Sequence, residues 1–160
     1  MEESLTRTME TEKRMETLHS VIDSEFELTK ADMKTATPLT LAFVGDNVYD
    51  LVVRTMLFEE GNRKLNDIHK KKSSLVKAET QALIAEFLSE NNLFTEEEAE
   101  YYRKGKNAKT LSHAKNAGIK EYHKATGLEC VMGFLYLTDR EERAVELCKL
   151  GISAYLNGFS

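Results

Sequence analysis

Tryptophan is absent from this 160-residue sequence, proline occurs once and glycine eight times. An all-β fold needs turn clusters rich in glycine and proline, so their scarcity argues against such a fold. Leucine, alanine, glutamate and lysine, which favour helix, are abundant instead. The composition therefore predicts an all-α fold, in a chain long enough for one domain with its own hydrophobic core.

Cysteine is scarce too, and long apolar runs are missing. The two cysteines, Cys130 and Cys148, have no cysteine or histidine neighbours at zinc-ligand spacing, so we expect buried free thiols. No stretch approaches the roughly 20 apolar residues of a membrane helix. The sequence also opens without the apolar segment of a secretory signal. These features predict a cytoplasmic protein.

A net charge of −5 is unusual for a protein that binds nucleic acid, but the charge is segregated along the chain. Acidic residues gather in the N-terminal arm and between Glu86 and Glu100. Residues 62–77 and 102–124 are basic, and each segment contains a single acid. Such segments are typical of surfaces that bind phosphate groups. The candidate residues are Lys70, Lys71, Lys72, Lys104, Lys106, Lys109 and Lys115.

The chain divides into an N-terminal arm and a main domain. Residues 1–37 are polar and weakly periodic, and we expect an accessory arm that is partly helical or mobile. Thr37 followed by Pro38 predicts the start of a helix that continues to about Phe58. The main domain, residues 38–160, has further helical patterns over about 65–91, in one or two segments, over about 122–137 and from about 139 onward.

A further helix in the main domain is predicted by its capping residues. Thr95 with Glu98 three positions later matches a capping box, which marks a helix start. The helix is then expected to run through Tyr101 and Tyr102 to a C-terminal glycine, Gly105, since glycine is common at helix C-termini.

Acidic residues interrupt two of the predicted helices. Asp46 and Asp50 lie in a helix that is apolar around nearly its whole circumference, and Glu129 lies alone in the apolar run of residues 125–137. A carboxylate is costly to bury unless a cation or several hydrogen bonds compensate. The pattern indicates carboxylates that converge on a hard divalent cation such as Mg²⁺.

Glycines accompany both acidic helices. Gly45 precedes Asp46, and Gly127 and Gly133 bracket Glu129. A glycine inside a helix costs about 1 kcal/mol relative to alanine, which is best tolerated where another backbone approaches closely. Asp46 could nevertheless pair with Arg54 or a lysine as a structural ion pair, and the residues alone leave that alternative as open as the metal site.

Four segments, in consistent order from residue 38 to the C-terminus, resemble one enzyme family. The sequence LAFVGDNVYD (41–50) resembles the signature helix of ribonuclease III, and TGLECVMGFLYL (126–137) resembles its second acidic helix. The segments NDIHKKKSSLV (66–76) and RKGKNAK (103–109) are similar to Mini-ribonuclease III, the bacterial form that lacks a double-stranded-RNA-binding domain.

The resemblance implies an all-helical homodimer in which two signature helices meet and a cleft holds double-stranded RNA. Each subunit would be an Mg²⁺-dependent endoribonuclease that hydrolyses one strand, with residues 38–160 as the catalytic domain. Asp46 and Glu129 match the metal-binding catalytic acids, and Asp50 matches a further catalytic acid. The RNA-facing elements of the family match Lys70, Lys71, Lys72, Lys104, Lys106, Asn107, Lys109 and Lys115.

Two positions depart from the full-length enzymes. Ala42 stands where they have glutamate, and Thr126 stands where they have aspartate. A reduced acidic set of this kind fits the minimal subgroup. The resemblance further implies that the substrate is precursor 23S ribosomal RNA and that a ribosomal protein is a candidate helper.

Two other functions compete with the enzyme. The chain could be a catalytically inactive ribonuclease III-like module that binds RNA or the ribosome, although such a binder has no need to retain both Asp46 and Glu129. It could also be a helical protein-interaction module whose acids are structural and whose basic segments keep the surface soluble.

Overall fold

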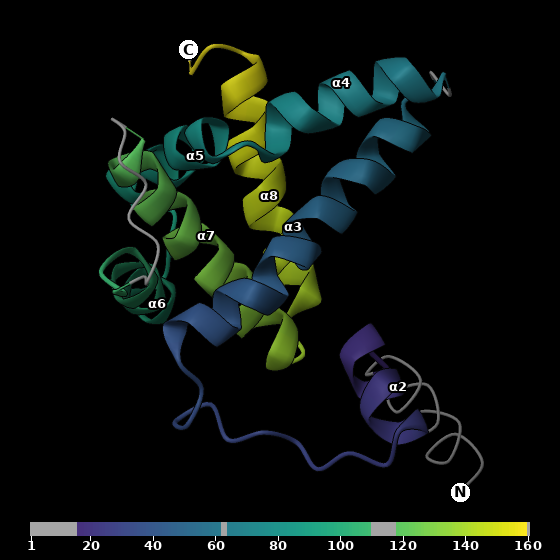
Figure 1. Cartoon of the computed structure of the whole chain (residues 1–160), viewed down its shortest axis with the longest axis vertical. Helices are drawn as coiled ribbons and strands as arrows, with labels where there is room; N and C mark the ends of the chain where they lie inside the picture. Colours follow the sequence, from purple (N-terminus) through teal and green to yellow (C-terminus); the bar gives the residue numbers. More distant parts are fainter. Residues whose placement is uncertain (1–15, 62–63, 110–117, 160) are drawn as a thin grey trace, which may run out of the picture.

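The computed structural model describes residues 16–61, 64–109 and 118–159. Regular structure in these ranges is entirely helical, so the predicted all-α fold is confirmed (Figure 1). No described helix combines the length and apolar content needed to cross a membrane. The helices are α2 (Leu18–Glu25), α3 (Pro38–Glu59), α4 (Leu65–Val76), α5 (Ala78–Glu90), α6 (Glu96–Lys106), α7 (Ile119–Leu137) and α8 (Glu141–Leu156).

The predicted helix starts are confirmed by their caps. The Thr37 hydroxyl accepts a hydrogen bond from the backbone N–H of Thr40 at 3.2 Å, and Pro38 occupies the first turn of α3. At α6, the Thr95 hydroxyl accepts from the backbone N–H of Glu98 at 3.1 Å, and the Glu98 carboxylate accepts from the backbone N–H of Thr95 at 3.0 Å. The region predicted as one or two helices contains two, α4 and α5, which separate at Lys77.

The predicted end of α6 at Gly105 is wrong, because the helix includes this residue and ends at Lys106. Gly105 instead allows α6 to approach α7. A Cβ atom at this position would lie 2.7 Å from Cβ of Cys130 and 2.9 Å from Cα of Gly127. The glycine therefore serves helix packing, and Asn107 caps the helix.

Helix α7 is the centre of the bundle, with α3, α5, α6 and α8 packed around it (Figure 1). Its side chains at Leu128, Val131, Met132 and Leu135 are at most 1% exposed. Cys130 in α7 is buried and unpaired, as is Cys148 in α8, so both expected free thiols are confirmed. An almost wholly apolar helix is stable here because neighbours cover it on several sides.

Helix α3 is apolar around nearly its whole circumference, but within the described chain it packs against the bundle with one face only. Tyr49 and Val53 are fully buried against the bundle, whereas Phe43 is 76% exposed and Leu51 is 55% exposed. These two exposed side chains lie eight residues apart, about two helical turns, and so share a face. The described chain therefore leaves an apolar face of α3 uncovered.

The helix of the N-terminal arm, α2, is attached to the bundle by polar contacts at the turn between α7 and α8. Asp139 in this turn accepts a hydrogen bond from the Thr17 hydroxyl at 2.7 Å, lies 2.9 Å from Nδ1 of His19, and pairs with Lys30 at 2.6 Å. The hydrogen bond from Lys30, with those from Thr17 and His19, lowers the pKa of Asp139 to about 2. Phe26 just after α2 remains 72% exposed.

Candidate active site

The site begins where α3 and α7 cross with their backbones in contact. A Cβ atom at Gly45 would lie 1.7 Å from the carbonyl oxygen of Glu129, and one at Gly133 would lie 1.9 Å from that of Leu41. No other residue type fits at either position without moving a helix. The close approach predicted for these two glycines is confirmed, and it brings the helix turn that carries Asp46 next to Glu129.

Asp46 and Glu129 interact electrostatically across this crossing. Burial raises the pKa of the Glu129 carboxyl group, the nearby charge of Asp46 raises it further, and the result is about 7. Glu129 is partly buried, whereas Asp46 is exposed, because it lies beside the uncovered face of α3. The expectation that Asp46 is buried is therefore wrong, although the two acids do lie close together.

Asp50 has a cationic partner of its own. Its carboxylate pairs with Nε of Arg54 at 2.6 Å, one helical turn later in α3. The alternative in which Arg54 neutralises Asp46 is thus not what the structure shows. Across residues 16–61, 64–109 and 118–159, neither Asp46 nor Glu129 forms an ion pair with lysine, arginine or histidine.

Gln81 in α5 is a third member of the site that the sequence analysis missed. Its side chain is 2% exposed, its Nε2 donates a hydrogen bond to the carbonyl oxygen of Val76 at 2.8 Å, and its amide counteracts the rise in the pKa of Glu129. The sequence does contain a pattern that indicates a special role for Gln81. Gln81 lies on the same helix face as Ile84, Ala85 and Leu88, which are fully buried, so it is a polar residue at a core position.

The two departures from the full-length ribonuclease III pattern are both buried in helix packing. Ala42 is 5% exposed in the face of α3 that meets the bundle. Thr126 is also 5% exposed, and its hydroxyl donates a hydrogen bond to the carbonyl oxygen of Tyr122 at 2.8 Å within α7. Its hydroxyl is thus engaged within its own helix.

The acids present are few but suited to magnesium. The described residues contain no group of three histidine, cysteine, aspartate or glutamate side chains that could enclose a metal ion. Mg²⁺ does not need such a group, because it keeps several waters and is commonly held by one or two carboxylates together with substrate phosphates. Asp46 and Glu129, which form no ion pair with the cationic side chains that the structure describes, fit that requirement.

The predicted RNA-binding residues form two separate groups. Lys70 and Lys71 are exposed on α4 and Lys72 is partly exposed, whereas Lys104 and Lys106 belong to α6. Helices α4 and α6 lie on opposite sides of the bundle, so the structure does not bring the groups together within one chain (Figure 1). Asn107 and Lys109 follow α6 and are exposed. Lys115 lies outside the described residues.

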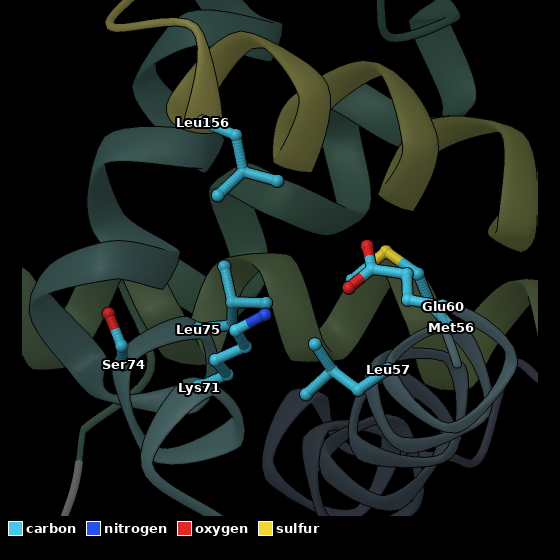
Figure 2. Close-up of a pocket in the computed structure, with 7 residues that line it drawn as sticks. All are labelled: Met56, Leu57, Glu60, Lys71, Ser74, Leu75 and Leu156. Carbon is cyan, nitrogen blue, oxygen red and sulfur yellow. The ribbon is translucent and has the colours of Figure 1, made fainter. Parts of the chain in front are cut away.

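A pocket of about 310 Å³ lies away from these acids, between α3, α4 and α8. Figure 2 shows Leu156 reaching it from α8, opposite Leu57 and Leu75. Neither Asp46 nor Glu129 lines it, so it is not the candidate active site. Its lining residues are Met56, Leu57, Glu60, Lys71, Ser74, Leu75 and Leu156.

Comparisons with known proteins show which family the chain resembles. The family described as "Ribonuclease III domain" matches residues 39–140. The protein named Mini-ribonuclease 3 in Clostridium tetani is 40% identical over 131 residues, which are 81% of this chain and 85% of that protein. Mini-ribonuclease 3 of Staphylococcus aureus is 42% identical over 69% of this chain and 83% of its own length.

A solved structure is similar as well. The crystal structure of a protein from Fusobacterium nucleatum superposes with a TM-score of 0.66 at 27% sequence identity. The match covers 78% of this chain and 98% of that one.

Proposed function

The chain belongs to the ribonuclease III family, in the Mini-ribonuclease 3 group, and is an endoribonuclease, and from this premise we propose that it hydrolyses double-stranded RNA with Mg²⁺ held by Asp46 and Glu129. The observation that carries the proposal is the meeting of these two acids at the crossing of α3 and α7, where no lysine, arginine or histidine among the described residues forms an ion pair with either of them.

Each residue of the site has a defined part in this proposal. Asp46 and Glu129 supply the protein oxygens for the cation, and waters and phosphate oxygens complete its coordination. When bound, the cation polarises the phosphate and makes a hydroxide available near neutral pH. The raised pKa of Glu129 means that the free carboxyl group exchanges a proton near neutral pH, so proton loss accompanies cation binding. Asp50, paired with Arg54, has at most an indirect role.

Substrate contacts are proposed for the two basic groups. A-form RNA hides its major-groove base edges, so recognition falls on phosphates, 2′-hydroxyl groups and overall shape. We assign phosphate contacts to Lys70, Lys71 and Lys72 on α4, and to Lys104, Lys106, Asn107, Lys109 and Lys115 at and after the end of α6. Because α4 and α6 lie on opposite sides of one chain, a single duplex would contact both groups only if two chains cooperate.

A homodimer is proposed on the uncovered face of α3. Phe43 and Leu51 are 76% and 55% exposed, and an apolar face of this kind is typical of an interaction surface. The catalytic domain would be residues 38–160, with 1–37 as an accessory arm. Precursor 23S ribosomal RNA in the cytoplasm, with or without a ribosomal-protein helper, is the substrate we infer from the family resemblance.

The test is cleavage of long duplex RNA with and without Mg²⁺ by the wild-type protein, Asp46→Asn and the matched control Asp50→Asn. We expect metal-dependent cleavage, lost by at least about a thousandfold in Asp46→Asn, since a direct metal ligand disappears. Asp50→Asn should lose less than about tenfold, because that carboxylate already has a partner.

Two other outcomes would contradict the proposal. RNA binding without cleavage would indicate an inactive RNA-binding or ribosome-associated module. Absence of RNA binding would indicate a protein-interaction module.

A further inference from the structure

His19 is a buried histidine whose two ring nitrogens both face carboxylates. The residue lies in α2 and is 7% exposed. Its Nδ1 lies 2.9 Å from Oδ1 of Asp139, in the turn between α7 and α8, and its Nε2 lies 3.1 Å from Oδ2 of Asp23, one turn later in α2. A neutral imidazole ring has one N–H and donates to only one of these carboxylates, whereas a protonated ring donates to both. The geometry therefore fits the charged ring.

The surroundings of His19 are predominantly acidic. Its backbone N–H donates to Oε1 of Glu141 at 3.4 Å, so a third carboxylate lies beside it. In the described chain, Lys30 is the one cationic side chain that pairs with a carboxylate of this group, through Asp139, and it is exposed. Hydrogen bonds from Lys30, Thr17 and His19 lower the pKa of Asp139 to about 2, so this carboxylate is charged at neutral pH. Tyr136, whose ring centroid lies 5.5 Å from that of His19, is uncharged there because burial raises its pKa.

The attachment of α2 to the bundle depends on these polar contacts. Side chains of Thr17, His19 and Lys30 link the arm to the turn between α7 and α8, and all three contact Asp139. Figure 1 shows α2 set apart from the other helices. Apolar side chains of α2 and the residue after it remain exposed, at Leu18, Val21, Ile22 and Phe26. A segment that buries little apolar surface detaches at a low cost in free energy.

We propose that a proton on His19 controls this attachment: α2 is docked on the turn between α7 and α8 while the ring is charged, and it is released when the ring loses its proton. Loss of the proton leaves one ring nitrogen with a lone pair that faces a carboxylate, so a hydrogen bond becomes a repulsive contact. Docking therefore weakens as the pH rises through the range in which histidine side chains change charge, about pH 5 to 8. The inference is independent of the proposed function, since neither Asp46 nor Glu129 takes part.

The variant Asp23→Asn separates the effect of the proton from the loss of a contact. An asparagine amide donates to a neutral Nε2 while the N–H at Nδ1 still donates to Asp139, so an uncharged ring satisfies both neighbours. Asp23 contacts His19 within α2, so the links to the bundle stay in place. The matched control is His69→Gln, which removes an exposed histidine of α4, a helix that lies away from α2 (Figure 1).

The experiment uses NMR on the full-length protein between about pH 5.5 and 8.5. Heteronuclear NOE values of the backbone amides of α2, compared with those of α8, report docking, and ring ¹⁵N shifts report the protonation of His19. In wild type and His69→Gln, we expect both ring nitrogens to carry protons in docked α2. The ratio of docked to free α2 should fall by at least about tenfold over this range, as expected for the loss of one charge-assisted hydrogen bond. In Asp23→Asn the ratio should change by less than about threefold.

Several results would overturn the inference. Docking of equal strength across this pH range in wild type is one, and a neutral His19 ring in docked α2 is another. A fall in Asp23→Asn as large as that in wild type would show that the proton on His19 is not the cause. Release of α2 at every pH in Asp23→Asn would show that the carboxylate, and not the charge of the ring, holds the helix.

Discussion

Glu98 is buried and Glu129 is partly buried, but the side chains that surround the two carboxylates differ in charge. Glu98 is 2% exposed, and its two carboxylate oxygens accept hydrogen bonds from Arg143 at 3.0 and 2.8 Å and from the backbone of Thr95. Glu129 has Asp46 and the amide of Gln81 as neighbours, and in the part of the chain that the structure describes no cationic side chain pairs with it.

The pKa values of the two glutamates diverge accordingly. Burial by itself would raise the pKa of Glu98, but the hydrogen bonds from Arg143 and Thr95 outweigh burial and lower it. Burial and Asp46 raise the pKa of Glu129 to about 7. A buried acid whose oxygens all have hydrogen-bond or cationic partners stabilises the fold. A buried acid without such partners lowers the stability of the folded state, and a bound cation can offset that loss.

The largest expected effect separates the two residues by activity. Glu129→Gln should reduce duplex-RNA cleavage by at least about a thousandfold, because the amide cannot replace an anionic metal ligand. Glu98→Gln, assayed at a temperature where it is fully folded, should lose less than about threefold. Similar losses of cleavage activity in Glu129→Gln and Glu98→Gln would contradict the assignment of Glu129 to catalysis and of Glu98 to the fold.

The second effect reverses the order of the two residues. Glu98→Gln should lower the free energy of unfolding at pH 7 by about 2–4 kcal/mol, because Arg143 loses its buried anionic partner. The pKa of Glu98 is lowered in the folded state, so this contribution is present above about pH 4.5 and is lost as the pH falls through the folded-state value. Urea unfolding at pH 7 and pH 3 measures it, and an equal loss at both would contradict the account.

The third effect is a gain in stability. The pKa of Glu129 is raised to about 7 in the folded state, so the metal-free protein loses stability as the pH rises from about 5 to 8. Glu129→Gln has no such charge and should be more stable than wild type by about 1–3 kcal/mol at pH 8, with the difference gone near pH 5. Urea unfolding in a chelator checks this. A difference in stability that does not vary with pH would mean that the charge of the Glu129 carboxylate does not destabilise the folded protein.

The smallest effect concerns a third acid, Asp139, which has several partners but is 30% exposed at its side chain. Asparagine, like aspartate, tolerates the left-handed backbone conformation at position 139, where φ is 61°, so Asp139→Asn adds no backbone strain. It should cost less than about 1 kcal/mol and leave cleavage unchanged, because exposed ion pairs contribute little. Thermal unfolding tests this, and a loss comparable to that of Glu98→Gln would show that exposure does not decide the value of these contacts.

The sequence predicted the helices well because the signals were local. Thr37 with Pro38, and Thr95 with Glu98, mark helix starts through contacts within one turn, and the structure has both. Gly105 failed as a helix end because its role is set by α7, a helix that follows it in the chain and packs against it. Local patterns do not report such contacts between helices.

The site was predicted in part for the same reason. Asp46 and Glu129 stood out as charges in apolar runs, and the glycines beside them indicated the close crossing. The sequence did not predict that Asp46 is exposed and Glu129 partly buried. An apolar run has the same sequence pattern whether the chain itself or a second molecule covers it. Gln81 was missed because a single amide in an amphipathic helix carries no charge to draw notice.

The most direct test of the central claim is a crystal structure of the wild-type protein with Mn²⁺, examined by its anomalous scattering. We predict one strong anomalous peak within about 2.0–2.4 Å of a carboxylate oxygen of Asp46 and of Glu129, with the remaining ligands being water. A protein that cleaves duplex RNA yet binds Mn²⁺ elsewhere, or holds these two carboxylates too far apart to share one ion, would contradict the claim.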